Sequence, residues 1–418
     1  MDTDVIVIGA GLAGLQCARR AQRGGLRVAV LEAGDGVGGR VRTDRIDGFL
    51  CDRGFQVLNA AYPAVRDWID VPGLGLQRFG AGVVVRTDEG SSTLAHPLRH
   101  PQHAPETLRS RHFPVSDVLA LARWIGPTLM RPSVVRRADQ DQTLAASFDE
   151  AGLTGRLRRD VLDTFLAGVL ADSTGGSSAN FVRYLMRFFA LGVPGLPGAG
   201  MQALPEQMAA WLDEPVRLGV AAREIRETPD GVRVDTDDGQ LSARAAVVAV
   251  GPQDVAALTS LPAPITRGLT TWWFRSPDQP QRHPFLILDA SRPGGGPAGP
   301  IWHTAVVSNA APSYAPAGEH LIEATTLLDR PDGRADEVAV RRDLGRLYET
   351  STQGWEVLAH HVVDHTLPAQ LPPFVEREPR WTGERVLVTG DHQGSGSIQG
   401  ALVSGDRAGR AVTDLLAT

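Results

Sequence analysis

Lysine is absent from this chain of 418 residues, so all 42 of its basic side chains are arginines. Its absence excludes three kinds of site: the lysine of a phosphate-binding P-loop, a Schiff-base lysine and a lysine general base. Cysteine is scarce as well, with only Cys17 and Cys51. Two isolated cysteines form neither a metal-binding spacing nor a disulfide framework, and no His, Asp and Glu set has metal spacing. The sequence therefore predicts no metal site.

Apolar runs long enough to span a bilayer are also missing, and no basic segment with a cleavage site precedes the first predicted strand. The net charge of -6 argues against a nucleic-acid partner, because phosphate binding needs a basic surface. Hydrophobic residues make up 42% of the chain and charged residues 22%, as in globular proteins. We expect a cytoplasmic enzyme, and the length favours two domains.

The strongest positive signal lies at the N-terminus, where an apolar run at residues 4–8 leads into a glycine-rich turn and a helix. A tight turn needs Gly9, a phosphate can approach the backbone at Gly11, and Gly14 lets the helix pack closely on the strand. The N–H groups that open this helix favour an anion. The candidate contacts are Gly9, Gly11, Leu12, Ala13 and Gly14.

A second buried strand at residues 27–31 ends at Glu32, followed by Ala33. An acidic side chain about 20 residues after such glycines is where a ribose 2′-hydroxyl needs an acceptor. Strand, glycines, helix, strand and acid in this order predict a dinucleotide site rather than an ordinary turn.

A further glycine-rich turn, ending in Gly38, Gly39 and Arg40, extends the motif beyond what nicotinamide dehydrogenases require. Arg40 can contact a pyrophosphate with its charged fork. Here the chain resembles the flavoprotein superfamily of amine oxidases, protoporphyrinogen oxidase and phytoene desaturases, whose N-terminal signature is GxGxxG, an acid and GGR. The resemblance implies that the cofactor is FAD.

Other candidate contacts rest on the same resemblance. In this superfamily the region of Gly54, Phe55 and Gln56 passes the flavin ring, and Ala222 lies beside the adenine. Near the C-terminus a buried strand ends at Gly390 and Asp391, and a glycine/serine loop feeds a helix. Asp391 would accept from a ribityl hydroxyl, and the N–H groups from Ser397 to Gly400 would face the flavin N1–O2 edge. This helix start adds Ser397, Ile398 and Gln399 to the candidates.

The predicted fold class is α/β, with a Rossmann-like FAD-binding domain interleaved with an α+β substrate domain. Residues 1–60, 195–255 and 380–418 would form the FAD domain, and residues 61–194 and 256–379 the substrate domain. A helical pattern runs from about residue 116 to 211. One predicted buried face there consists of Val118, Leu119, Leu121, Ala122 and Ile125, and a second of Phe181, Leu185, Phe188 and Phe189, which line either the core or a substrate tunnel.

Two departures from the superfamily concern the substrate. Its amine oxidases carry a lysine near flavin N5 and an aromatic cage that includes a tyrosine before the C-terminal helix. This chain has no lysine, and residues 395–397 are Ser-Gly-Ser at that place. Its ending is more similar to that of phytoene and related desaturases.

Three functions follow from this comparison. The first is hydride transfer from a substrate C–H bond to flavin N5, desaturating or dehydrogenating an apolar, isoprenoid- or carotenoid-like molecule. The second is an amine oxidase with an atypical cage. The third is a non-catalytic carrier, as in the Rab escort proteins of this fold. No catalytic residue is predicted, and among the histidines His392 is the best candidate for a place near the flavin.

A last hypothesis concerns a membrane surface. The segment from Val118 to Arg137 places apolar residues and Trp124 among four arginines, a composition suited to a helix in a bilayer interface. Pro127 and Pro132 interrupt it. The alternative is that this helix only covers a core.

Overall fold

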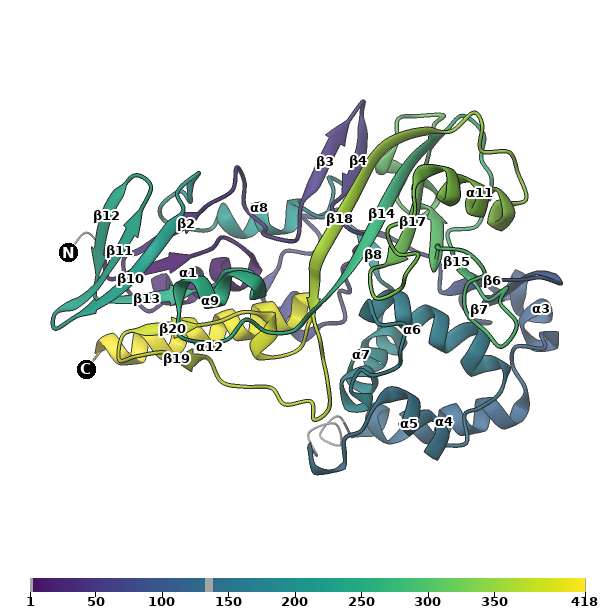
Figure 1. Cartoon of the computed structure of the whole chain (residues 1–418), viewed down its shortest axis with the longest axis horizontal. Coiled ribbons are helices and arrows are strands. Elements are labelled where there is room, and N and C mark those ends of the chain that lie inside the picture. The colour runs from purple at the N-terminus through teal and green to yellow at the C-terminus, as the bar shows by residue number, and fades with distance from the viewer. Residues whose placement is uncertain (1–2, 132–137, 418) are drawn as a thin grey trace.

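A mostly parallel sheet joins strands from three distant parts of the chain (Figure 1). The computed structural model describes residues 3–131 and 138–417. Its strand order is β19-β20-β13-β1-β2-β9, and only β19 runs antiparallel to its neighbour. The strands are β1 Val5–Ile8, β2 Val28–Glu32, β9 Arg217–Leu218, β13 Ala245–Val248, β19 Arg380–Trp381 and β20 Val386–Val388. The predicted α/β fold class is confirmed.

Helices from the two ends of the chain pack against each other beside this sheet (Figure 1). They are α1, Leu12–Arg23, and α12, Ile398–Ala417. A Cβ atom at Gly405 would overlap the Ala13 carbonyl oxygen, so the two backbones approach at a distance that only glycine permits. This contact brings the two predicted cofactor motifs together.

A small antiparallel meander lies next to the parallel sheet. Its strands are β10 Ala222–Thr228, β11 Gly231–Thr236 and β12 Gly239–Ala243. The turn at residues 237–239 leads into β12, which runs back along β11 before the chain enters β13 of the parallel sheet. In β12 only Leu241 and Ala243 are apolar, which is too weak an alternation to identify a strand.

The second half of the molecule is organised by a seven-stranded sheet with the order β18-β14-β17-β16-β15-β6-β7. Two long strands, β14 and β18, extend back toward the parallel sheet (Figure 1). β6 and β7 form an antiparallel hairpin, and helix α11, Glu337–Tyr348, follows β17. The strands are β6 Gly82–Thr87, β7 Gly90–Ala95, β14 Thr266–Ser276, β15 Leu286–Asp289, β16 His303–Val306, β17 His320–Leu327 and β18 Glu356–Pro368.

Short elements complete the described chain. β16 ends at Val306, and α10 begins at the next residue, Val307. The other strands are β3 Thr43–Ile46, β4 Phe49–Asp52, β5 Gln77–Arg78 and β8 Gly195–Leu196. The remaining helices are α2 Pro63–Trp68, α3 Ala104–Arg109, α4 Val115–Met130, α5 Leu144–Glu150, α6 Asp163–Leu170, α7 Ala179–Leu191, α8 Ala203–Ala209, α9 Val255–Leu258 and α10 Val307–Ala310. The predicted domain boundaries stay a prediction.

The predicted buried face of α4 is correct for Leu121 and Ile125, which pack against the core, and wrong for Val118, Leu119 and Ala122, which are exposed. Val118 is 44% exposed and Leu119 57% exposed. The buried side chains are instead Asp117, Ala120, Trp124 and Thr128. They repeat at helical spacing, and the Asp117 carboxylate accepts a hydrogen bond from the Leu157 backbone N–H at 3.0 Å. Because its carboxylate is hydrogen-bonded, the polar Asp117 can lie on the buried face of α4. Hydrophobicity alone does not predict a buried position for an aspartate.

Trp124 does not lie at a surface, as the interfacial-helix hypothesis required. It is 4% exposed, and its Nε1–H donates to Ser147 Oγ at 2.9 Å. Residues 132–137 of that hypothesis, including two of its four arginines, lie outside the described residues. Within the described ranges, no helix is both long enough and apolar enough to cross a membrane.

Candidate functional site

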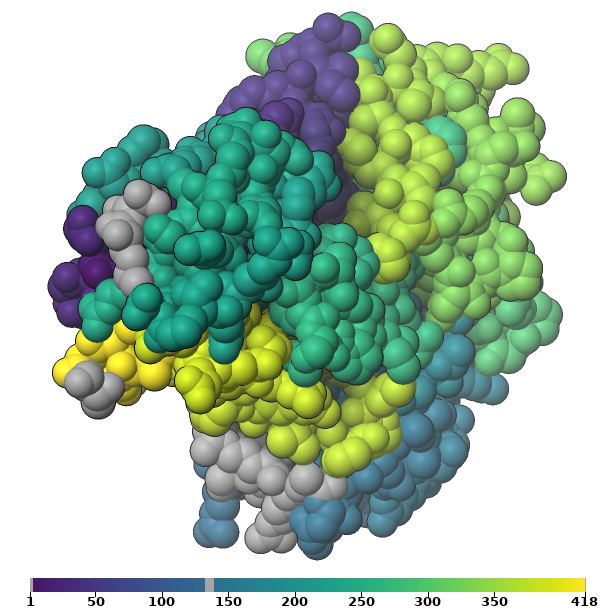
Figure 2. Space-filling view, turned by 60° about the vertical axis from the view of Figure 1, so that its left-hand side comes forward, coloured from purple at the N-terminus to yellow at the C-terminus, as the bar shows by residue number. Residues whose placement is uncertain are grey.

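A cavity of about 1120 Å³ lies between the parallel sheet and the second half of the molecule. The space-filling view shows a shadowed recess between the teal surface of the middle segment and the yellow-green surface of later strands (Figure 2). The volume slightly exceeds that of a typical single-ligand site, about 300–1,000 Å³. The cavity therefore has room for a large cofactor with a substrate beside it.

The first glycine-rich turn lines this cavity with Gly9, Gly11, Leu12 and Ala13. Gly9 has a φ of +103°, and a Cβ atom there would lie 2.7 Å from the Ala249 carbonyl oxygen. A Cβ atom at Gly11 would meet no protein atom within 4 Å. The open space at Gly11 is therefore part of the cavity, directly before the first residue of α1.

Glu32 and Ala33 line the cavity where β2 ends. The two carboxylate oxygens of Glu32 accept hydrogen bonds from the backbone N–H groups of Ala10 and Gly34, each at 2.8 Å. A carboxylate oxygen can accept more than one hydrogen bond, so a ribose hydroxyl can still donate to this group. Ala222 lines the same end of the cavity.

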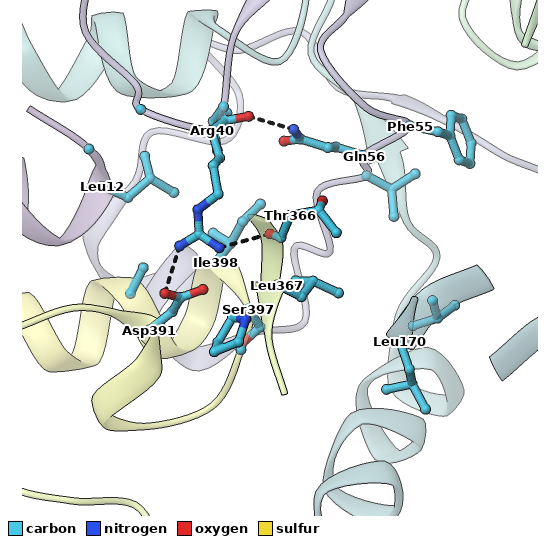
Figure 3. Close-up of a pocket in the computed structure, with 18 of the residues that line it drawn as sticks. Leu12, Arg40, Phe55, Gln56, Leu170, Thr366, Leu367, Asp391, Ser397 and Ile398 are labelled. Atoms are coloured by element: carbon cyan, nitrogen blue, oxygen red, sulfur yellow. Dashed lines mark hydrogen bonds and ion pairs between the residues drawn. The ribbon is translucent and has the colours of Figure 1, made fainter. Parts of the chain in front are cut away.

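Arg40 connects the N-terminal and C-terminal motifs. Its Nη2 lies 2.6 Å from Asp391 Oδ1, and its Nη1 donates to the Thr366 carbonyl at 2.8 Å (Figure 3). Gly38, Gly39, Arg40, Gly390 and Asp391 all line the cavity. The structure thus gives Arg40 a carboxylate partner that the sequence did not predict, and a pyrophosphate contact of Arg40 stays a prediction.

The start of α12 offers fewer free N–H groups than expected. Ser397 and Ile398 line the cavity. However, the Gly400 N–H donates to Ser397 Oγ at 3.1 Å, and the Ser397 N–H donates to the Ser395 carbonyl at 2.7 Å. Ser397 thus caps the helix. The expectation that the N–H groups of Ser397 and Gly400 face a ligand is wrong; that of Ile398, which lines the cavity, remains for that role.

The segment after β4 brings Phe55 and Gln56 to the cavity. The Phe55 N–H donates to Thr271 Oγ1 at 3.1 Å, and Gln56 Nε2 donates to the Arg40 carbonyl at 2.6 Å (Figure 3). These bonds attach the segment to β14 on one side and to the glycine-rich turn on the other. The cavity wall is therefore continuous between the two halves of the molecule.

Three predicted contacts do not line the cavity. A Cβ atom at Gly14 would overlap the Gly9 carbonyl oxygen, so this glycine serves the close packing of α1 on β1. Gly54 has a φ of +88° and forms the turn before Phe55. Gln399 is buried, and its Oε1 accepts the Ala64 N–H at 2.9 Å. Its side chain joins α12 to α2.

One part of the cavity, the apolar half, is lined by aliphatic and aromatic side chains. Phe181, Leu185 and Phe189 of α7 line it, whereas Phe188 packs in the core against Tyr62 with ring centroids 4.8 Å apart. The predicted face of α7 therefore serves both the core and the cavity. The apolar half consists of Phe113, Val161, Phe165, Val169, Leu170, Phe181, Leu185 and Phe189.

Two histidines, His96 and His303, line the cavity, and His392 does not. Burial lowers the pKa of His392, and neither of its ring nitrogens has a hydrogen-bond partner among the described residues. His303 is the first residue of β16 and packs against Phe55 with ring centroids 5.5 Å apart. No local motif marks His303, because its position depends on the pairing of distant strands.

The lining residues fit FAD. Open backbone at Gly11, an acceptor at the end of β2 and the Arg40–Asp391 pair follow one another along the cavity wall. The open backbone suits a pyrophosphate, the acceptor suits a ribose hydroxyl, and the Arg40–Asp391 pair suits a hydroxylated chain. Within the described ranges, no group of three or more His, Cys, Asp or Glu side chains could hold a metal ion.

Comparison with solved structures supports the fold. An oxidoreductase from Methanosarcina mazei superposes with a TM-score of 0.73 and 16% identity, covering 99% of this chain and 100% of that one. A putrescine oxidase bound to putrescine gives a TM-score of 0.71 and 18% identity over the full length of both chains. At such low identity the likeness concerns the fold alone.

Comparison with curated proteins gives partial matches. The pseudooxynicotine dehydrogenase of a Pseudomonas species is 27% identical over 266 residues, 60% of this chain and 52% of that protein. Putrescine oxidase from Kocuria rosea is 28% identical over 60% of this chain and 57% of that protein. Hydroxyneurosporene desaturase from Rhodobacter capsulatus is 51% identical over 57 residues, 14% of this chain and 12% of that protein. The chain thus spans about half the length of the first two relatives.

The family described as flavin containing amine oxidoreductase matches residues 12–413, almost the whole chain. That range begins in the glycine-rich turn and ends inside α12, so it contains nearly all of the cavity wall. The chain therefore belongs to the flavin-containing amine oxidoreductase family, and FAD is its cofactor.

Proposed function

We propose that this protein is an FAD-dependent oxidoreductase that takes a hydride from a C–H bond of a predominantly apolar, isoprenoid- or carotenoid-like small molecule. The flavin supplies the hydride acceptor when bound, and the chain supplies position and environment. The observation that carries the proposal is the apolar half of the cavity, which continues from the segment expected to hold the cofactor.

The charges along the cavity favour an apolar substrate over an amine. Among the described residues, the carboxylates that line the cavity are Glu32, which ends β2, Asp254, which comes after β13, and Asp391, which comes after β20. None lies in the apolar half. A protonated amine there would lose its hydration without gaining a counter-charge, and buried unpaired charges are costly. Amine oxidation is the alternative function, because putrescine oxidase and pseudooxynicotine dehydrogenase are among the relatives.

The first expected result concerns substrate class. On anaerobic mixing, polyprenyl compounds should bleach the flavin absorbance, whereas putrescine and benzylamine should not. We expect the Leu185→Asp variant, which places a carboxylate in the apolar half, to slow bleaching by the polyprenyl compounds. A matched change at the exposed Leu191, Leu191→Asp, should leave the rate unchanged. Fast bleaching by a simple amine would instead favour the amine oxidase.

A contact with membranes is a second expectation, since an isoprenoid substrate partitions into lipid. The exposed side of α4 carries Val115 at 75%, Leu119 at 57% and Met130 at 84% exposure, next to exposed Arg123 and Arg131. Apolar side chains among arginines suit the surface of an anionic bilayer. Of these residues, the sequence alone predicts a buried position for Leu119 and places Arg123, Met130 and Arg131 in the interfacial segment.

Sedimentation with anionic liposomes at low salt tests this surface. We expect part of the protein to pellet, and less of it as salt screens the arginines. The double variant Val115→Glu/Leu119→Glu should remain in the supernatant. Wild-type protein that stays in solution at low salt would show that α4 does not dock on membranes.

A further inference from the structure

A buried histidine and a buried glutamate form a pair on the face of the second sheet that meets the cavity. His303 lines the cavity and is 5% exposed, and Glu323 is fully buried. In the β16–β17 ladder His303 lies opposite Thr325, and Glu323 opposite Ala305, so both side chains are on one face. His303 Nδ1 is 3.1 Å from Glu323 Oε1. The other Glu323 oxygen accepts from Thr325 Oγ1 at 3.0 Å.

The burial of the His303–Glu323 pair determines how many protons the two side chains share. Burial raises the pKa of Glu323, and the neighbouring His303 opposes that shift. A single negative charge in such a place is costly, so the pair is most stable with one shared proton and no net charge. The shared proton lies between Oε1 and Nδ1, on either atom. In both arrangements the Nε2 of His303 keeps its own hydrogen and is a donor.

The Nε2–H group of His303 lies beside α6. No hydrogen bond joins Nε2 to another group among the described residues, and Gly168 of α6 lies beside it. A Cβ atom at Gly168 would lie 2.7 Å from Nε2, so glycine is needed for α6 to approach the ring. Gly168 and His303 both line the cavity. An unpaired donor in mostly apolar surroundings costs free energy unless a ligand accepts it.

We propose that His303 is a substrate-recognition residue whose Nε2–H donates a hydrogen bond to one oxygen atom, from a hydroxyl, ether or carbonyl group, on an otherwise apolar substrate. Glu323 is a positioning residue that holds the imidazole through Nδ1. The inference rests on the proposed function, because it presumes a substrate in the apolar half. It narrows that substrate to an oxygenated molecule.

The test compares ligands that share one apolar skeleton. Farnesyl methyl ether and farnesol carry an oxygen acceptor, and the hydrocarbon farnesene carries none. Dissociation constants would come from the change in flavin absorbance during anaerobic titration of the FAD-loaded protein. We expect the ether and the alcohol to bind about tenfold more tightly than farnesene, the size of one hydrogen bond in a buried site.

Two variants distinguish a role of His303 in substrate recognition from a purely structural role. His303→Phe keeps a ring of similar size but no donor, so the ether should lose about tenfold in affinity while farnesene binds as before. Glu323→Gln should keep the preference for the ether, because the amide N–H can donate to Nδ1 and leave the hydrogen on Nε2. FAD content and melting temperature serve as the structural readouts.

Each contrary outcome is distinct. If wild-type protein binds ether and farnesene equally, the role of His303 is wrong while the apolar substrate class stands. If His303→Phe loses affinity for all three ligands equally and loses FAD, the pair is structural only. If FAD-loaded wild-type protein binds none of the three, the proposed function fails and this inference with it.

Discussion

Replacing Gly11 with valine is expected to abolish tight FAD binding while the protein remains folded. A Cβ atom at Gly11 meets no protein atom within 4 Å, so the new side chain occupies cavity rather than core. Gly11 has extended φ and ψ values of -73° and 175°, which valine adopts without strain. Overlap between the side chain and the dinucleotide should cost about 1–3 kcal/mol, about five- to 150-fold in affinity.

The measurement is an FAD titration of the apo-protein followed by flavin fluorescence, with melting temperature as a check on folding. Gly11→Ala should give a smaller loss than Gly11→Val, because the overlap grows with side-chain size. Gly126→Ala is the matched control, since a Cβ atom there also meets no atom within 4 Å and Gly126 does not line the cavity. Normal FAD affinity in Gly11→Val would mean that the cofactor does not pass this turn.

The second large effect is expected from Asp391→Ala. This side chain is 6% exposed and accepts the short hydrogen bond from Arg40. Its removal leaves the guanidinium, itself two-thirds buried, without a counter-charge beside the cofactor. Hydrogen bonds to charged groups contribute about 1.5–3 kcal/mol, so both the free energy of unfolding and the FAD affinity should fall by amounts of that order.

Asp406→Ala provides a comparison for this variant. Asp406 is also buried and pairs with Arg410 at 2.8 Å on the same helix, but it does not line the cavity. It should lower the free energy of unfolding without changing FAD affinity. Asp391→Asn keeps one acceptor oxygen and should lie between wild type and Asp391→Ala. Unchanged FAD affinity in Asp391→Ala would exclude this carboxylate from the cofactor site.

The parts of the fold that sequence predicted well are those encoded locally. The strand at residues 5–8, the turn from Gly9 to Gly14 and the helix after it follow from neighbouring residues whose conformations are restricted. The same holds for the β6–β7 hairpin, where a run of three valines is followed by the polar turn at residues 87–90. In these segments the local preference and the final packing agree.

The parts that sequence did not predict depend on which segments meet in space. The buried face of α4 depends on the hydrogen bond that Asp117 accepts from the Leu157 N–H, 40 residues further along the chain. The Arg40–Asp391 pair joins residues 351 positions apart. His303 acquires its place through the pairing of β16 with β17 and the approach of α6 at Gly168. Hydrophobic periodicity contains no information on such contacts.

The central claim is that one dinucleotide spans the cavity from Glu32 and Ala222 to Asp391 and Phe55. Titrating the apo-protein with FAD and, separately, with FMN tests it most directly, because FMN lacks the adenosine half. One FAD should bind per chain, and FMN should bind more weakly by roughly tenfold or more, about 1.4 kcal/mol, for want of contacts at the Glu32 end. Equal affinity for FAD and FMN, or no flavin binding at all, would contradict the account.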